Sequence, residues 1–302
     1  MRDIYLGVDG GGTKTAFLLD VEGVRYESKQ ITIHPKQISK QQFFEIMKLG
    51  VGEVCEEASI KPEEISYTFV AAPGYGQYPD TEGYIDQGIR EAIGSDRFTV
   101  ANDCVNGWAG SLNAKPGINL VLGTGQIGYG VDEKGNSMRS GGWGPLLGDE
   151  ASGYYIGLKI LNHFTKMSDG RARKTVLYDL IRERLNLNND MEIIDLAENM
   201  KRDEIADLSK VFTKGLEEKD SYCESLLEEI AYESALVIDS IIKGLDFDSE
   251  VKVSYSGGVF NLGDKLISKI EEKSQNKIKI LEPYTNPSEG ALILAKMNKD
   301  LQ

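Results

Sequence analysis

Short apolar runs separated by polar or glycine-containing turns recur over the first third of the chain, which is typical of buried strands. Apolar runs near residues 3–9, 14–20 and 24–32 predict three successive strands joined by tight turns. The apolar spacing at about 39–58 predicts an amphipathic helix, and the segment ISYTFVAA at 65–72 predicts a fourth strand. Together with the segments that follow, this order predicts a mixed α/β sheet.

The remaining elements follow from the same patterns. A helix at about 81–93, a strand at 97–103 and a short helix from Val105 complete the first half. The second half is mainly helical and then returns to strands, with helices at about 150–165, 172–186 and 202–244, a strand at 250–258, a helix, a strand at 277–282 and a last helix from Pro287.

The opening pattern occurs a second time. The segment INLVLGTGQIGYGVDEKG at 118–135 repeats the order of IYLGVDGGGTKTAFLLDVEG at 4–23: apolar strand, Gly/Thr turn, second strand, acidic turn. The motifs DVEG and DEKG are 112 residues apart, and at that offset Gly11 aligns with Gly123. This degenerate duplication predicts two related domains.

Composition and charge exclude several classes of partner. The 302 residues carry a net charge of −14, which argues against nucleic acid and against an anionic membrane surface but permits a small anionic ligand. Cys55, Cys104 and Cys223 are far apart, so a zinc knuckle or a sequence-local cluster site is not expected. This sparse cysteine content, with no signal-peptide pattern or membrane-length apolar run, favours a cytoplasmic location.

Three glycine-rich turns are candidate ligand sites. The tip DGGGTKT at 9–15 exposes backbone amides and hydroxyls that can hold an anion, because glycine permits close approach. GTGQIG at 123–128 matches a dinucleotide fingerprint, but a strand follows where that fingerprint needs a helix. The opening motif departs from a Walker A loop for the same reason. The third turn, SYSGGVFN at 254–261, leads from a strand into a helix, and each turn alone is equally explained as structural.

Carboxylates accompany these turns. Asp9 and Asp103 end predicted strands, and Asp149 precedes a predicted helix, so each can hold Mg²⁺ or accept a proton. The alternative for each is a helix cap or a turn residue. Trp143, between glycines, can lie under a sugar ring or belong to the core. His34 and His163 are too far apart to imply a catalytic dyad.

Taken together, these segments resemble the N-acetylglucosamine kinase family within the BadF/BadG/BcrA/BcrD ATPase group, in the actin-like sugar kinase and Hsp70-type ATPase superfamily. The resemblance covers nearly the whole chain and rests on GVDGGGTKT, ND at 102–103, GTG at 123–125, GGWGPLLGDEASGYYIG at 141–157 and SGGV. It implies an α/β fold with two ribonuclease-H-like (actin-like ATPase) domains and an interdomain cleft. The first domain would span 1–115, completed by the helix at 287–302, and the second 116–286 with a helical insertion.

The resemblance also implies a role for each matching residue. Asp103 would be the general base that takes a proton from the sugar hydroxyl, and Asp9 would help to hold Mg²⁺. The ATP phosphates and adenosine would be bound by Gly10, Gly11, Gly12, Thr13, Lys14, Gly123, Thr124, Gly125, Gly257 and Gly258. The sugar pocket would be lined by Asp103, Gly142, Trp143, Gly144 and Asp149.

The implied activity is ATP-dependent phosphorylation of an amino sugar, with N-acetylglucosamine as the leading candidate and a homodimer as the expected assembly. Two departures from the eukaryotic members bear on the sugar. Gln126 and Ile127 replace a Ser-Asn pair, and Ile33-His34 replaces an Asn-His pair. Glucosamine, N-acetylmuramic acid or a hexose are therefore alternative substrates. An ATPase activator of a protein partner is disfavoured because this chain lacks the paired cysteines of that class, and a non-catalytic sugar sensor because Asp9 and Asp103 are retained.

Overall fold

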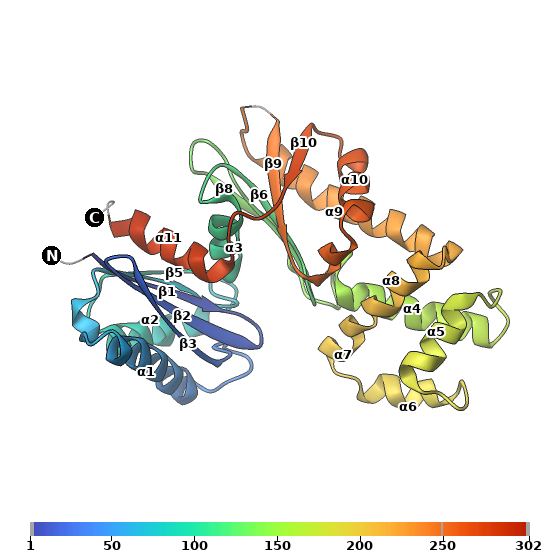
Figure 1. The fold of residues 1–302 in the computed structure, drawn as a ribbon, viewed down its shortest axis with the longest axis horizontal. Helices are drawn as coiled ribbons and strands as arrows, with labels where there is room; N and C mark the ends of the chain where they lie inside the picture. Colours follow the sequence, from blue (N-terminus) through green and yellow to red (C-terminus); the bar gives the residue numbers. More distant parts are fainter. Residues whose placement is uncertain (1–2, 249, 300–302) are drawn as a thin grey trace. The chain divides into compact units, whose positions relative to one another are not determined.

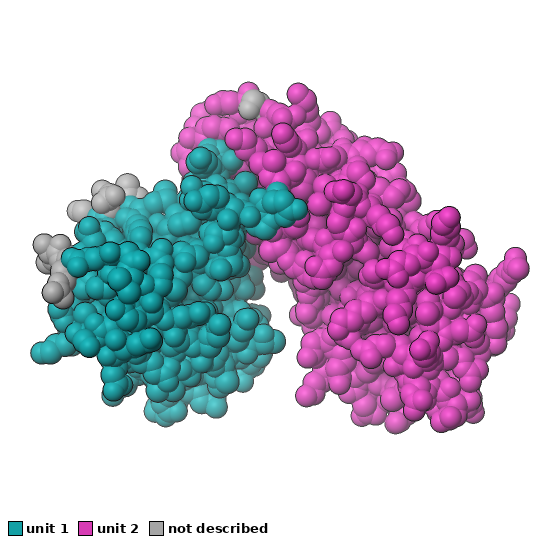
Figure 2. All heavy atoms as spheres, viewed as in Figure 1, with its two compact units in different colours: residues 1–116, 282–302 teal, residues 117–281 magenta. Residues whose placement is uncertain are grey.

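The computed structural model describes residues 3–248 and 250–299. The chain divides into two compact units, one of residues 1–116 and 282–302 and the other of residues 117–281 (Figure 2). Each unit contains one five-stranded sheet, and the units are described separately below.

The sheet of the first unit has the strand order β3-β2-β1-β4-β5. The first three strands form an antiparallel meander, and β4 and β5 continue the sheet parallel to β1. Its strands are β1 (Ile4–Gly10), β2 (Lys14–Val21), β3 (Val24–Ile31), β4 (Tyr67–Ala71) and β5 (Phe98–Ala101). The apolar runs of β1 and β2 are buried along most of their length, with Leu6, Val8 and Phe17 fully buried, as the sequence pattern predicts.

Helices cover both faces of this sheet (Figure 1). Four helices and one 3₁₀ turn surround it: α1 (Lys40–Glu57), η1 (Pro62–Glu64), α2 (Pro79–Ile93), α3 (Asp103–Leu112) and α11 (Pro287–Lys299). The sequence places the start of α3 at Val105, but the helix begins two residues earlier because the Asn102 side chain caps it by accepting from the Cys104 N–H at 3.2 Å. Asp103 is therefore the first residue of a helix, two residues beyond the end of β5.

Helices α3 and α11 approach each other through glycines. A Cβ atom at Gly290 would lie 2.0 Å from the carbonyl oxygen of Asn106, and one at Gly110 would lie 2.4 Å from the carbonyl oxygen of Asn286. Backbone atoms cannot move aside as a flexible side chain can. This close crossing holds the start of α11 against α3 and against β1.

We expect Gly290→Ala to lower the free energy of unfolding by about 3 kcal/mol, because the added methyl group would overlap backbone atoms of α3. Urea denaturation followed by circular dichroism measures this loss. Gly52→Ala is the matched control, since Gly52 lies in α1 with open space at its Cβ position, and there alanine should stabilise the helix slightly. Equal stability of the Gly290 variant and the wild type would contradict the close-packing argument.

The second unit repeats the sheet topology. Its strand order is β10-β9-β6-β7-β8, with an antiparallel meander from β6 to β8 and parallel pairing of β9 and β10. Its strands are β6 (Gly117–Leu122), β7 (Gln126–Val131), β8 (Ser137–Gly141), β9 (Val251–Ser256) and β10 (Ile278–Leu281). The two sheets share one topology, so the predicted mixed α/β fold with two ribonuclease-H-like sheets is confirmed.

The helices of the second unit extend well beyond its sheet. They are α4 (Gly153–Ser168), α5 (Val176–Leu185), α6 (Glu192–Asn199), α7 (Arg202–Asp207), α8 (Ser209–Glu217), α9 (Ser221–Gly244), η2 (Gly258–Leu262) and α10 (Asp264–Lys273). Helix α9 packs against β6, β7 and β8, and α10 packs against α9 and β10.

Besides the start of α3, three further details of the predicted elements are wrong. The single helix predicted at 202–244 is three helices, because Lys219 adopts a left-handed conformation and Asp220 caps a new helix by accepting from the N–H groups of Tyr222 and Cys223. Helix α6 and strand β8 were not predicted, and β8 in particular has no buried apolar run.

None of the helices in the described part of the chain has both the length and the apolar character that a membrane crossing needs.

Candidate active site

The turn between β1 and β2 is held in place by its backbone and by one neighbouring hydroxyl. The Gly11 N–H donates to the Lys14 carbonyl at 2.9 Å, and the Thr32 hydroxyl donates to the Gly11 carbonyl at 2.7 Å. A Cβ atom at Gly10 would lie 2.6 Å from the Ala71 carbonyl oxygen, so only glycine fits there. The tip is therefore a rigid loop at the end of β1.

The outer residues of this turn are open to a ligand. Gly12, Thr13 and Lys14 are exposed, and a Cβ atom at Gly12 would meet nothing within 4 Å. The empty space beside Gly12, the exposed hydroxyl of Thr13 and the ammonium of Lys14 are suited to an anionic group.

Asp9, near the end of β1, is held by two residues that the sequence did not indicate. Its Oδ1 accepts from the Asn106 side-chain amide at 2.7 Å, and its Oδ2 accepts from the Ser288 hydroxyl at 3.2 Å. Asn106 also donates to the Pro287 carbonyl at 3.0 Å, which ties α3 to the first turn of α11. Burial raises the pKa of Asp9, while these two hydrogen bonds and the charge of Lys14 act against that rise.

Asp103 lies at the start of α3, where its surroundings disfavour the ionised form of its carboxylate. Burial, and secondly the negative charge of Asp9, raise the pKa of Asp103 to about 6. A carboxylate with this pKa is ionised at neutral pH but holds a proton much more readily than an exposed aspartate does. The negative charge of Asp9, near the end of β1, therefore acts on Asp103, which follows β5 at the start of α3, although β4 lies between these two strands in the sheet.

These two carboxylates are the only candidate metal ligands among the predicted site residues of the first unit. In residues 3–248 and 250–299, no group of three or more His, Cys, Asp or Glu side chains converges as a protein-only metal site. Mg²⁺ does not need such a cage, because it commonly binds one or two carboxylates together with water and phosphate oxygens. The donor chemistry of Asp9 and Asp103 therefore fits Mg²⁺ that arrives with a nucleotide.

The corresponding turn of the second unit lies between β6 and β7. The Gly123 N–H donates to the Gly125 carbonyl at 2.9 Å, and the Gly123 carbonyl accepts from the Gly153 N–H at 2.8 Å. Gly153 is the first residue of α4, whose N-cap is Ser152. The turn is thereby joined to a helix N-terminus, where backbone N–H groups and the helix dipole favour anions.

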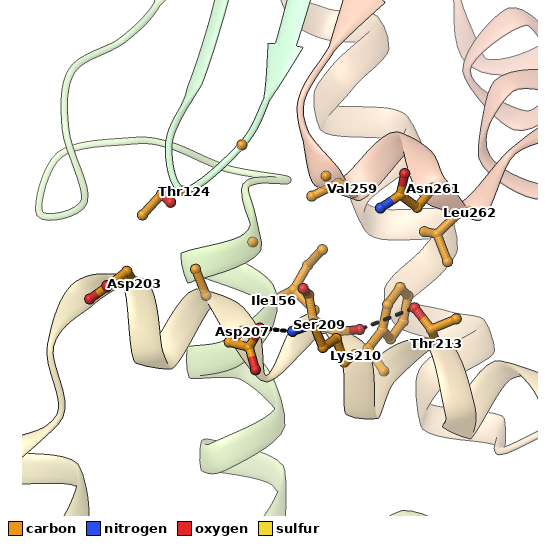
Figure 3. A pocket seen from close by; sticks show the side chains of 15 residues that line it. Thr124, Ile156, Asp203, Asp207, Ser209, Lys210, Thr213, Val259, Asn261 and Leu262 are labelled. Carbon is orange, nitrogen blue, oxygen red and sulfur yellow. Dashed lines mark hydrogen bonds and ion pairs between the residues drawn. The ribbon is translucent and has the colours of Figure 1, made fainter. Parts of the chain in front are cut away.

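A pocket of about 560 Å³ opens beside this turn (Figure 3). The turn, η2 and helices α7 and α8 surround it, and its volume lies in the usual range for a small-molecule site. It combines apolar walls with a few polar groups; among the lining residues are Gly123, Thr124, Ile156, Asp203, Lys210, Phe212, Thr213, Gly258, Val259, Asn261 and Leu262.

The third glycine turn closes one side of this pocket. Gly257 has φ +103°, and a Cβ atom there would lie 2.3 Å from the Leu122 carbonyl oxygen, so the ends of β9 and β6 meet only because this residue is glycine. Gly258 lines the pocket and leaves open space at its Cβ position. The structure therefore brings Gly258 together with Gly123 and Thr124 around one pocket, and their binding of adenosine and phosphate stays a prediction.

The segment after β8 presents an aromatic side chain on a turn. Gly141, Gly142 and Gly144 all have positive φ angles of 69° to 84°, a region that L side chains rarely adopt. Trp143 between them is 66% exposed. An exposed indole on a shaped glycine turn is suited to stack against the apolar face of a sugar ring.

Unlike Trp143, Asp149 is not exposed to a ligand. Its side chain is buried, 3% exposed as a residue, and forms an ion pair with Arg202 of α7. Its Oδ1 also accepts from the Gln126 N–H at 3.4 Å. Asp149 thus connects the loop after β8, the start of β7 and the helical region, and Arg202 is a residue that the sequence did not indicate.

The positions that depart from the eukaryotic kinases have distinct environments. Ile33 is fully buried against Gly10 in the core of the first unit, and His34 accepts from the Lys36 N–H at 3.1 Å through Nδ1. The Gln126 side chain is 2% exposed and its amide has no hydrogen-bond partner in the described chain. Ile127 lies beside Gly142, whose Cβ position would be 2.8 Å from the Ile127 Cδ1 atom.

Comparisons with known proteins agree with this architecture. The chain is 31% identical to an N-acetyl-D-glucosamine kinase from Dictyostelium discoideum, over 99% of each chain. It is 29% identical to an N-acetylmuramic acid/N-acetylglucosamine kinase from Clostridium acetobutylicum, over 98% of this chain and 99% of the relative. A structure from Chromobacterium violaceum, solved as a candidate N-acetylglucosamine kinase, superposes with a TM-score of 0.78 at 21% identity, covering 97% of this chain and 99% of that one.

The family assignment follows from a match along almost the entire sequence. The sequence profile of the BadF/BadG/BcrA/BcrD ATPase family covers residues 6–295, which include all three glycine turns, the pocket and the loop that carries Trp143. The chain belongs to the BadF/BadG/BcrA/BcrD ATPase family.

Proposed function

We propose that this protein is an ATP-dependent kinase of amino sugars, with N-acetylglucosamine as its leading substrate. The observation that carries the proposal is Asp103, a carboxylate beside Asp9 whose pKa is raised to about 6, in a chain that matches two amino-sugar kinases along its full length. Such a carboxylate can accept the proton of a sugar hydroxyl at neutral pH.

Each unit supplies a different share of the chemistry. In the second unit, the pocket lined by Gly258, Phe212 and Thr213 takes the adenosine, and Gly123 and Thr124 take the adjoining phosphates. In the first unit, the turn at Gly10–Lys14 binds the phosphates with backbone N–H groups and the Lys14 ammonium. Charge neutralisation and positioning account for most of the catalysis in phosphoryl transfer.

Asp9 is the residue that would hold Mg²⁺, and Asp103 is reserved for the proton of the sugar hydroxyl. When bound, the ion would neutralise the charge of the phosphate oxygens. Asn106 and Ser288 fix the orientation of the Asp9 carboxylate, so this oxygen donor is in place before any ligand arrives.

In the chemical step, Asp103 accepts one proton from the sugar. A sugar hydroxyl oxygen forms a bond to the γ-phosphorus of ATP, and the bond from that phosphorus to the bridging oxygen of ADP breaks. Asp103 takes the hydroxyl proton, and ADP leaves with the electron pair of the broken bond. Trp143 and the glycines beside it position the sugar for this attack.

The test is an ADP-release assay with ATP, Mg²⁺ and a panel of sugars: N-acetylglucosamine, N-acetylmuramic acid, N-acetylmannosamine, glucosamine and glucose. Sugar-dependent release with an N-acetylated amino sugar supports the proposal, and mass spectrometry of the phosphorylated sugar identifies the product. Slow ATP hydrolysis that no sugar accelerates would contradict it and would favour an ATPase that acts on a protein partner.

The pH dependence follows from the raised pKa of Asp103. We expect kcat/KM for the sugar to be level above pH 7 and to fall tenfold per unit well below an apparent pKa near 6, because only the ionised carboxylate accepts a proton. Rates measured from pH 5 to 8 at saturating ATP test this expectation. A profile that stays level down to pH 5 would contradict the assignment of Asp103 as the base.

We place the enzyme in the cytoplasm as a homodimer, in line with the resemblance. All three cysteines are free and buried, which suits a reducing compartment. Light scattering of the purified protein tests the assembly.

A further inference from the structure

The second glycine turn lacks the cation that the first one carries. At the offset of 112 residues that relates the two turns, Lys14 aligns with Gln126. Lys14 is exposed and charged, whereas the Gln126 side chain is uncharged and buried. Phosphate groups are bound most strongly where a cation accompanies the backbone N–H groups. In the second unit, a cation at this turn therefore comes from elsewhere in the sequence.

Arg202 of α7 brings a cation to this turn. Its Nη2 atom lies 3.0 Å from the point where Gly125 would carry a Cβ atom. The pocket of the second unit is lined by Gly123 and Thr124 but not by Gly125. The guanidinium thus lies beside the part of the turn that is farther from the pocket assigned to adenosine, and the β- and γ-phosphates of ATP extend in that direction.

A buried carboxylate holds this guanidinium in place. The Arg202 Nη2 donates to Asp149 Oδ2, while Asp149 Oδ1 accepts from the Gln126 N–H at 3.4 Å. The Asp149 side chain is 4% exposed and the Arg202 side chain is 44% exposed, so part of the guanidinium remains open to a ligand. The backbone of Asp149 is left-handed, with φ 62°, which residues other than glycine rarely adopt. The loop therefore fixes the carboxylate, and with it the arginine, before any ligand arrives.

The guanidinium has donors to spare. An arginine side chain carries five N–H groups, and in the described part of the chain its bond to Asp149 through Nη2 is the one hydrogen bond that Arg202 makes with its side chain. The guanidinium also lies 5.7 Å from the centroid of the Tyr154 ring. Its remaining N–H groups form a planar fork, whose geometry matches two oxygens of a phosphate group.

We propose that Arg202 binds the terminal phosphates of ATP and that Asp149 positions it for this contact. The inference rests on the proposed function, which assigns the turn to phosphates, and it adds a phosphate-binding residue to that function. Arg202 neutralises phosphate charge beside the second turn, as Lys14 does at the first. Because charge neutralisation supplies much of the catalysis in phosphoryl transfer, the contact also accelerates the chemical step.

The test measures the binding of a non-hydrolysable ATP analogue and of AMP by isothermal titration calorimetry, with Mg²⁺ and without a sugar. We expect Arg202→Met to raise the Kd for the analogue by about 10- to 100-fold, because one charge-assisted contact is lost. The Kd for AMP should stay within about twofold of wild type, because AMP lacks the terminal phosphates. Arg202→Lys should recover part of the affinity, since it restores the charge without the planar fork.

A double variant separates this role from that of a purely structural ion pair. Arg202→Met leaves the Asp149 carboxylate buried and unpaired, which by itself destabilises the fold. Arg202→Met combined with Asp149→Asn leaves neither partner of the pair charged, so its Tm should return toward the wild-type value. We expect its affinity for the analogue to stay low, because the guanidinium is still absent.

Arg182→Met is the matched control, because Arg182 of α5 also forms an ion pair within the second unit, with Asp190 at 3.3 Å, and does not line the pocket. It should leave both Kd values unchanged. Three results would overturn the inference while the proposed function stands: wild-type affinity for the analogue in Arg202→Met, an equal loss for the analogue and AMP, or recovery of affinity in the double variant. Weakened binding of the analogue in Arg202→Met, in a protein whose ATP hydrolysis no sugar accelerates, would support the role of Arg202 and overturn the proposed function.

Discussion

Asp103→Asn should lower kcat by about two to four orders of magnitude while leaving sugar and ATP binding nearly unchanged. Asparagine has the same shape as aspartate and can still form a hydrogen bond to the substrate hydroxyl, but it cannot accept the hydroxyl proton. The loss should therefore appear in kcat rather than in KM. Steady-state kinetics with the preferred sugar, together with direct measurement of ATP and sugar affinities by calorimetry, separates the two effects.

The same variant should be more stable than the wild type above pH 7. The folded-state pKa of Asp103 is about 6, above the ordinary value of 3.8, so folding favours the protonated form. Its stabilising contribution is present below about pH 4 and is lost as the pH rises through 6. Asparagine removes the buried charge, so thermal unfolding should show a higher Tm for the variant at pH 8 and a smaller difference at pH 4.

An exposed aspartate of the same unit provides the control. Asp80→Asn, in the first turn of α2, should change neither kcat nor the pH profile. Another group would be the base if Asp103→Asn kept wild-type kcat. The same would follow if the residual activity of the variant still fell below about pH 6, as the wild-type kcat/KM is expected to do. An inactive variant with a lowered Tm would instead indicate that Asp103 is structural.

The glycine turns could be located from the sequence because their chemistry is local. Gly10, Gly12 and Gly123 lie between two apolar runs, and the tight connection of two paired strands is determined by a few adjacent residues. The repeat at an offset of 112 residues similarly predicted two related domains, and the two sheets do share one topology. The position of a turn within a single hairpin can therefore be predicted from the amino-acid sequence alone.

The side chains that hold Asp9 and Asp149 could not be found in this way. Ser288 is 279 residues from Asp9, and Arg202 is 53 residues from Asp149. These pairs form only after α11 returns to β1 and α7 packs beside the loop after β8, and no local pattern records either event. For Asn106 the sequence did contain one weak indication of its role. It lies one helical turn after Asp103 and so faces the same side of α3.

The helical region was misread for a related reason. Apolar spacing continues through residues 202–244, which predicts one helix. The second break depends on the left-handed backbone of Lys219 and the extended backbone of Asp220, whereas the backbone of Leu208 at the first break is itself helical. Those breaks also shape the pocket of the second unit. They turn α7 and α8 toward the pocket, so that Asp203, Phe212 and Thr213 line it.

Gly12→Val should raise the Kd for ATP by about 10- to 100-fold without unfolding the protein. The position of a Gly12 Cβ is open, with no atom within 4 Å, and its φ angle is not in the left-handed region, so the backbone tolerates a side chain there. In the proposed complex that open space holds phosphate oxygens, and a branched side chain would separate them from the N–H groups of the turn. The loss corresponds to one or two charge-assisted hydrogen bonds.

Two further variants make this expectation specific. Gly83→Val, in α2, also places a side chain in open space and should leave both ATP affinity and Tm close to wild type. Gly123→Val tests the equivalent turn of the second unit, where the Cβ position is likewise open, and it should weaken ATP binding to a similar extent. Isothermal titration with a non-hydrolysable ATP analogue measures all three. Wild-type affinity in Gly12→Val with a loss in Gly123→Val would mean that only the second turn binds phosphate and that DGGGTKT is a structural hairpin.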